Sequence, residues 1–350
     1  MDKQRDHSSD TGSLNNETHE PMMVESARAV GTDESPEVKL STLEKVQRNP
    51  IGRSISRVCL YLIGYTILLT IFVVFSQSIT SVKLGVDIED PLVTANATGF
   101  LFASTIGVFL FSRLRKGHFW KEDVPRKNKK MTADVFFKVL PVFLAGQLLF
   151  TGLDGVIEAI ANQFGMTFKL ATESATAGST TISMFLYAGF FAPISEELIF
   201  RGAILRYLER YGKVFAIVMS SVLFGLFHMN LVQGLFAFSI GLVMAYVAVE
   251  YSLFWAIFLH MFNNLFMGDI LGTLLGLLPE PTGNMIYFAI ITFACIYGLF
   301  ILYTHRRLIQ DYLDENQTPK GTYKKVLTSP VFWIFVILCI WSSFALIQPL

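Results

Sequence analysis

Ala192-Pro-Ile-Ser-Glu-Glu-Leu-Ile-Phe-Arg201 places two adjacent glutamates and an arginine inside a long apolar run. Each charged side chain at the centre of a membrane helix costs about 2.5–3.5 kcal/mol on insertion scales, so each one needs a reason to be there. Glu197 and Arg201 share one helix face, and we expect them to form an ion pair. Glu196 points about 100° away, which predicts a free carboxylate facing a cavity. Pro193 removes a backbone donor just upstream, which predicts a kink that opens a polar pocket.

The composition around this stretch is that of a membrane protein. Of the 350 residues, 52% are hydrophobic and only 16% are charged, and the mean hydropathy is +0.49. These proportions are too apolar for an ordinary soluble domain. The formal net charge is zero, so no global field attracts nucleic acid, and we expect no nucleic-acid partner. The sequence predicts an all-α, polytopic membrane helical bundle in contact with the lipid bilayer.

Apolar runs long enough to cross a bilayer recur along the chain. A helix needs about 20 apolar residues to span the hydrocarbon core, and the sequence predicts about eight or nine transmembrane helices. The candidate runs are residues 58–75, 94–111, 135–161, 182–205, 214–229, 232–249, 253–275, 285–303 and 330–347.

The distribution of polar and apolar residues divides the chain into four parts. Residues 1–50 are rich in Ser, Asp, Glu, Asn and Thr, which predicts a disordered tail. Residues 51–180 hold the first membrane spans and a basic loop at 112–134. Residues 181–275 are the membrane core that carries the polar motifs, and residues 276–350 hold the last spans.

Lysines and arginines in the short connections predict the orientation in the membrane. Basic residues precede the first span and follow the second, fourth and eighth, whereas the opposite connections contain only Lys83 and Lys169. Because basic loops are retained in the cytoplasm, we predict a cytoplasmic N-terminus. The loop 112–134 can also attract anionic headgroups, although a solvated topology signal is the simpler interpretation.

Two further apolar runs carry polar side chains at helical spacing. The fifth ends in Phe224-Gly-Leu-Phe-His228, and the seventh contains His260-Met-Phe-Asn-Asn264. A carboxylate, two imidazoles and a carboxamide suit amide hydrolysis. A glutamate can take a proton from water, one histidine can hold that water or protonate the leaving amine, and the second histidine with an asparagine can donate to the oxyanion. We expect Asn263 to pack between helices or to line the rim.

The same side chains are also a ligand set for a metal ion. Two histidines and a glutamate bind zinc in many proteins, so a metal, if bound, would be held by Glu196, His228 and His260. The sequence has no His-Glu-x-x-His motif, so the ligands would have to come from separate helices. The residues leave metal-dependent and metal-free mechanisms equally open, with zinc as the candidate cofactor.

Three motifs occur in a fixed order on successive apolar segments: Glu196-Glu197-x-x-x-Arg201, Phe224-x-x-x-His228 and His260-x-x-x-Asn264. Together they resemble the CPBP family, the CAAX protease and bacteriocin-processing proteins that are also called Abi proteins. The resemblance covers roughly residues 180–268. It identifies residues 181–275 as a CPBP-type catalytic core.

The resemblance implies an intramembrane endopeptidase that cleaves a peptide or protein substrate in the membrane. It implies that Glu196 and His228 activate the water and that His260 and Asn264 stabilise the oxyanion. Older descriptions call the family metalloproteases. The chain is similar to the bacterial members, which are linked to bacteriocin maturation, immunity or regulation, and this implies a multi-pass protein of the bacterial plasma membrane.

Two other hypotheses are open at this stage. The chain could be a non-catalytic membrane partner in bacteriocin immunity or in sensor-kinase regulation, in which case replacing Glu196 or His228 would leave the phenotype unchanged. It could also be a proton- or ion-coupled transporter in which glutamate and histidine relay protons. The transporter hypothesis gains little, because the sequence shows no inverted repeat and no paired broken helices.

Overall fold

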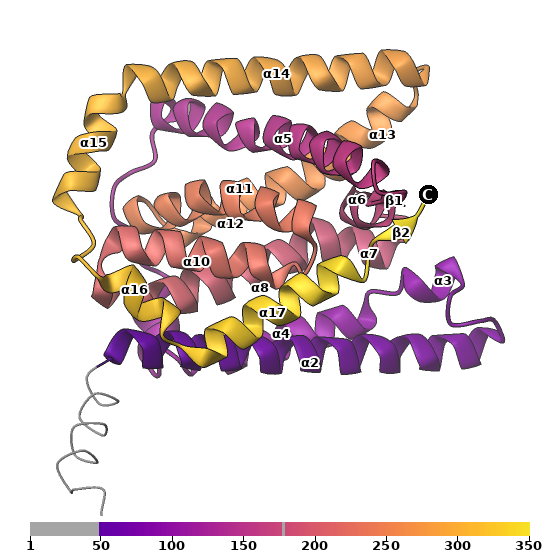
Figure 1. Cartoon of the computed structure of the whole chain (residues 1–350), viewed down its shortest axis with the longest axis horizontal. Helices are drawn as coiled ribbons and strands as arrows, with labels where there is room; N and C mark the ends of the chain where they lie inside the picture. Colours follow the sequence, from indigo (N-terminus) through magenta and orange to yellow (C-terminus); the bar gives the residue numbers. More distant parts are fainter. Residues whose placement is uncertain (1–48, 177–178) are drawn as a thin grey trace, which may run out of the picture. The chain divides into compact units, whose positions relative to one another are not determined.

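The computed structural model describes residues 49–176 and 179–350, so the predicted N-terminal tail lies almost wholly outside the described residues. The described part consists of helices joined by short loops, together with one pair of two-residue strands (Figure 1). This confirms the predicted all-α membrane bundle.

Several of the helices include π-helical segments. The elements before residue 177 are α2 (Pro50–Leu84), α3 (Pro91–Thr94), α4 (Thr98–Ser112), the π-helix η1 (Phe119–Asp123), α5 (Ala133–Asn162), β1 (Met166–Thr167) and α6 (Lys169–Thr176). The next are α7 (Ile182–Leu186), the π-helix η2 (Tyr187–Phe191), α8 (Ala192–Glu197), the π-helix η3 (Leu198–Leu205), α9 (Arg206–Leu208), the 3-10 helix η4 (Glu209–Tyr211) and α10 (Lys213–Phe227). The last are α11 (Leu231–Glu250), α12 (Leu253–Met261), the π-helix η5 (Phe262–Ile270), α13 (Leu271–Gly276), α14 (Glu280–Thr304), α15 (Arg306–Glu315), α16 (Thr322–Leu327), α17 (Pro330–Phe344) and β2 (Gln348–Pro349).

Seven of the described helices are long and apolar enough to cross a membrane, fewer than the eight or nine predicted. The difference lies in α10 and α17, each of 15 residues. At 1.5 Å per residue such a helix is about 22 Å long, whereas the hydrocarbon core is about 30 Å thick. The seven are Pro50–Leu84, Pro91–Ser112, Ala133–Asn162, Ile182–Tyr211, Leu231–Glu250, Leu253–Gly276 and Glu280–Thr304.

Side-chain caps fix where several helices begin. Asn49 accepts a hydrogen bond from the Gly52 amide at the start of α2, and Thr132 accepts one from the Val135 amide at the start of α5. Asn230 caps α11. Each cap satisfies an amide that the first helical turn leaves without an internal partner. The boundaries therefore follow from local sequence signals.

The centre of the bundle is built from α10 and α11, which pack closely, while α14 packs along α5 and α2 along α4 (Figure 1). Two glycines allow the approach of α10 and α11. A Cβ at Gly225 would lie 2.5 Å from the Gly234 carbonyl oxygen, and a Cβ at Gly234 would lie 2.8 Å from the Gly225 carbonyl oxygen. Small residues at helix contacts bring membrane helices together in this way. The close approach positions the end of α10, which carries His228.

One end of the bundle is tied together by a single buried carboxylate. Glu250, the last residue of α11, is only 4% exposed. Its oxygens lie 2.9 Å from Lys129 Nζ and 3.1 Å from Lys213 Nζ, and they accept a hydrogen bond from the Tyr312 hydroxyl at 3.0 Å. The loop before α5, the start of α10 and helix α15 therefore meet at the end of α11.

The basic loop 112–134 is more than a solvated topology signal. Arg115 donates two hydrogen bonds to Asp123, and Arg126 donates one to Glu209 at 2.9 Å. Several of its cations are thus paired with carboxylates. The loops that the predicted topology places on one side do meet at one end of the bundle, and which side is cytoplasmic stays a prediction.

Lys129→Met should lower the melting temperature at neutral pH, because it removes the ion pair with Glu250. The decrease should be only about 1–3 °C, because Lys129 is mostly exposed and solvent screens the pair. The hydrogen bond to Glu250 raises the pKa of Lys129 above its ordinary value of 10.5. The folded pKa therefore exceeds the unfolded one, so the stabilisation is complete below about pH 10.5 and is lost as the pH rises through the raised pKa. Thermal melting at pH 8 and at about pH 12 checks this, with the exposed Lys130→Met as control. A difference that persists at high pH would contradict it.

Candidate active site

Glu197 holds two cationic or basic partners on one carboxylate oxygen. Arg201 Nη1 donates to Glu197 Oε1 at 2.8 Å, and His260 Nδ1 donates to the same oxygen at 2.9 Å. The side chains of Glu197 and Arg201 are fully buried. The expected ion pair is present, and it also binds a histidine from α12. Because buried charges persist only when they are paired, this contact fixes α8 against α12.

Arg201 is enclosed by further groups of the core. Its Nη2 donates to the Gly241 carbonyl on α11 at 3.3 Å, and its guanidinium lies 4.2 Å from the centroid of the Phe224 ring. A desolvated guanidinium over an aromatic face is a favourable contact. Arg201 therefore joins α8 and η3 to α10 and α11.

His260 stands between the two adjacent glutamates. Its Nδ1 must carry the hydrogen that Glu197 accepts, because an ionised carboxylate only accepts. Its Nε2 lies 3.8 Å from Glu196 Oε2. The Glu196 side chain is 20% exposed, whereas that of Glu197 is 0% exposed. Of the two carboxylates, only Glu196 is open to a substrate or to water.

His228 reaches the same place from the end of α10. As the residue that follows the last helical turn, it donates from Nδ1 to the Phe224 carbonyl at 2.8 Å, which leaves Nε2 for another partner. The Phe224 ring stands edge-on to both imidazoles, with centroids 4.8 Å from His228 and 5.7 Å from His260. His228 also lies within charge-interaction range of Glu196 and Arg201.

Two tyrosines that the sequence did not indicate lie within charge-interaction range of Glu196. Tyr65 on α2 and Tyr187 on η2 both interact electrostatically with the Glu196 carboxylate. The Ser104 hydroxyl on α4 lies 3.4 Å from the Tyr187 hydroxyl. A hydroxyl inside a membrane span is itself a signal, since buried polar groups need partners, but hydropathy does not pair one span with another.

π-helical turns precede and follow the α-helical segment that contains Pro193. The Ala192 amide donates to the Tyr187 carbonyl, five residues back. In that register the Ala188 carbonyl would need the amide hydrogen of residue 193, which proline lacks. Asn264 Nδ2 donates to this carbonyl at 3.1 Å. The proline thus creates a backbone acceptor that holds the asparagine of η5.

Asn264 also belongs to a chain of side-chain amides. Its Oδ1 accepts from Asn263 Nδ2 at 3.1 Å, and Asn263 Oδ1 accepts from Gln147 Nε2 at 2.6 Å. Gln147 Oε1 in turn accepts from the Tyr287 hydroxyl at 3.3 Å. Asn263 therefore links hydrogen-bonding groups instead of only packing. Gln147 is an amide in the middle of an apolar run, which was a usable signal, but its partner could not be read from the sequence.

The six predicted site residues come from three stretches of chain, α8 with η3, the end of α10, and α12 with η5. Direct contacts join Glu197 to Arg201 and to His260, and His260 approaches Glu196. His228 meets this group through the Phe224 ring and through charge interactions. Asn264 follows His260 by about one helical turn and is held by other partners. The roles assigned to these residues stay predictions.

The metal site considered from the sequence is not assembled. Within residues 49–176 and 179–350, no group of three or more His, Cys, Asp or Glu side chains is placed to hold a metal ion. Zinc needs three protein ligands around one point in a catalytic site. In their described positions, Glu196, His228 and His260 do not fit a zinc centre.

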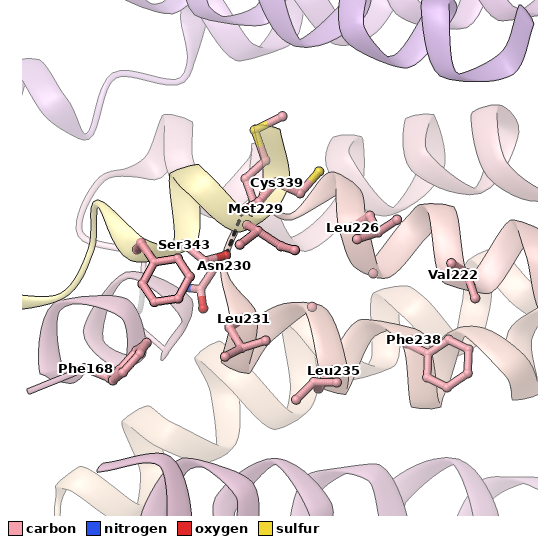
Figure 2. Close-up of a pocket in the computed structure, with 14 residues that line it drawn as sticks. Phe168, Val222, Leu226, Met229, Asn230, Leu231, Leu235, Phe238, Cys339 and Ser343 are labelled. Atoms are coloured by element: carbon pink, nitrogen blue, oxygen red, sulfur yellow. Dashed lines mark hydrogen bonds between the residues drawn. The ribbon is translucent and has the colours of Figure 1, made fainter. Parts of the chain in front are cut away.

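A separate cavity of about 270 Å³ lies on another face of α10. Figure 2 shows its mostly apolar lining, with Val222 and Leu226 from α10, Phe238 from α11 and Cys339 from α17. Residues 222 and 226 project away from the face that carries His228, because they are two residues out of phase with it on the helix. The cavity is therefore not part of the polar site.

A family model described as type II CAAX prenyl endopeptidase Rce1-like matches residues 178–266. The matched segment contains all three motifs, from Glu196 to Asn264. Comparisons with the curated proteins and with the solved structures gave no significant match.

Proposed function

We propose that the chain is an intramembrane endopeptidase that hydrolyses a peptide bond by water activated at Glu196 and His228, a proposal supported by the match of residues 178–266 to the family model of CAAX prenyl endopeptidases. The observation that supports this most is the position of His260 between a buried and a partly exposed glutamate, with His260 and His228 both against the Phe224 ring. A buried ion pair alone would only hold helices together. A second, accessible carboxylate beside two imidazoles adds the groups that peptide hydrolysis needs.

Water activation falls to the accessible side chains. The His228 Nδ1 hydrogen is held by the Phe224 carbonyl, so a neutral His228 has its lone pair on Nε2, where it accepts a hydrogen bond from water. Glu196 takes the proton as the water oxygen attacks the carbonyl carbon of the substrate. When the C–N bond breaks, protonated Glu196 returns this proton to the leaving amine. Glu196 therefore both takes up and gives back the transferred proton.

Oxyanion stabilisation falls to His260 and Asn264. The Glu197 carboxylate accepts the Nδ1 hydrogen of His260 and fixes the ring, so that Nε2 would be the donor to the oxyanion when it also carries a hydrogen. Asn264 Nδ2 has two hydrogens and gives one to the Ala188 carbonyl, so the second is a donor for the developing oxyanion. No step in this mechanism passes through a metal, because the described residues do not form a ligand set.

The substrate we propose is a membrane-associated protein or peptide, because the cluster lies on helices long and apolar enough to cross a bilayer. We further propose a multi-pass location in a bacterial plasma membrane, with the N-terminus in the cytoplasm, on the basis of the basic connections. The alternative, a non-catalytic membrane partner in bacteriocin immunity or sensor-kinase regulation, predicts a different result in the experiment below.

A comparison of membrane peptidomes from cells with the wild-type protein and with Glu196→Ala tests the proposal. We expect specific fragments to be absent from the variant, and their termini would give the cleavage site. Glu280→Ala, at an exposed position at the start of α14, is the control. If Glu196→Ala and His228→Ala both leave the peptidome and the phenotype unchanged, the non-catalytic function is correct.

A further inference from the structure

Gln147 is a buried amide in the middle of an apolar helix. It lies on α5, is 8% exposed, and comes from outside the segment that carries the motifs. A buried amide without hydrogen bonds is costly, so its partners explain its presence. Its two partners are Asn263 on η5 and Tyr287 on α14. Gln147 thus connects the N-terminal and C-terminal spans to the candidate active site.

The direction of the hydrogen bonds along this chain is fixed from one end. The Ala188 carbonyl can only accept, so Asn264 must turn its nitrogen toward it and its oxygen toward Asn263. Asn263 must then donate to Asn264 and accept from Gln147. A flip of any one amide would set two oxygens or two nitrogens against each other. The chain therefore holds the Asn264 amide in one of its two orientations.

This orientation matters because of what the Asn264 amide has to do. We propose that Gln147 and Asn263 are positioning residues that hold the Asn264 amide with its free N–H directed at the substrate oxyanion, and that Tyr287 fixes Gln147 in turn. The inference rests on the proposed function. An oxyanion donor contributes only when it is held in place before the charge develops. Without the chain, Asn264 has only the Ala188 carbonyl to orient it.

Gln147→Met, which keeps the side-chain length and removes both hydrogen bonds, should lower kcat by about 10- to 100-fold with KM unchanged, less than the roughly 10²–10³-fold loss expected from removing a donor outright. The measurement is cleavage by the purified full-length protein of a peptide that spans the cleavage site found in the peptidome comparison. Gln163→Met, at the exposed end of the same helix, should leave kcat unchanged.

A double-variant cycle separates positioning from general damage. In an Asn264→Ala background, Gln147→Met should have no further effect, since the amide that it positions is gone. An equal loss of kcat in both backgrounds, or no loss in either, would overturn the inference. Tyr287→Phe removes only the hydroxyl and should lower kcat by about 2- to 5-fold, again without effect once Asn264 is replaced. If Gln147→Met does not fold, the same cycle with Tyr287→Phe tests the inference in its place.

The result also separates this inference from the proposed function. Cleavage that is lost in Glu196→Ala but normal in both Gln147→Met and Tyr287→Phe would leave the peptidase standing and remove the positioning role. Cleavage that is unchanged in Glu196→Ala would remove the peptidase itself.

Discussion

Glu196→Gln should lower peptide cleavage by about 10²–10⁴-fold, the usual contribution of a general base. The carboxamide has nearly the same shape as the carboxylate but cannot take a proton from water. Because Glu196 is partly exposed and makes no ion pair with Arg201, the substitution should leave folding intact. A loss of kcat without a loss of melting temperature is therefore the expected result.

The measurement is the single-turnover cleavage rate of purified wild-type and variant protein, with thermal melting of each. Glu280→Gln, which makes the same chemical change at an exposed position, should cleave at the wild-type rate. Glu196→Asp moves the carboxylate back by about one methylene and should retain a small part of the activity. Cleavage by Glu196→Gln at the rate of the wild type would show that another group activates the water.

Arg201→Met should destabilise the protein by about 3–5 kcal/mol, the cost of leaving a buried charge without its partner. Arg201 is fully buried and holds Glu197, the Gly241 carbonyl and the Phe224 ring at once. We expect a markedly lower melting temperature in detergent and a lower yield from membranes. His260 would still contact Glu197 but could not neutralise it unless protonated.

The double variant Glu197→Gln/Arg201→Met tests whether the unpaired charge is the cause. It removes both charges together and should be more stable than Arg201→Met alone, by roughly 1–3 kcal/mol on the scale of coupling energies. Arg210→Met, which removes an exposed arginine outside the cluster, is the control. If the double variant is as unstable as the single one, Arg201 acts by packing and not by neutralising Glu197.

The fold class followed from hydropathy because a helix is one of the few ways to satisfy backbone groups in lipid. The number of spans was predicted less accurately than the fold class. The apolar run 214–229 is short, and the helix that it forms, Lys213–Phe227, is shorter still because the backbone leaves the helix at Met229, whose φ is 52°. Helix length depends on where caps and turns fall, and hydropathy does not record these.

The site was predictable as far as helical spacing reaches. Spacing predicted the contact between Glu197 and Arg201, which are on one helix. It could not predict that His260 would also bind Glu197, because that contact joins residues 63 positions apart. The amide chain through Gln147 could not be predicted for the same reason, because it joins residues of three helices.

The two short helices have a consequence for the surrounding bilayer. Helices α10 and α17 are neighbours, and each is about 8 Å shorter than the hydrocarbon core is thick. The residues of α10 are buried or half-buried, whereas one side of α17 is exposed, so acyl chains that meet α17 would have to compress and thin the membrane there. A thinner membrane would bring the aqueous phase closer to the end of α10, where His228 lies. Water, which the proposed hydrolysis consumes, would then cross a thinner apolar layer to reach the site.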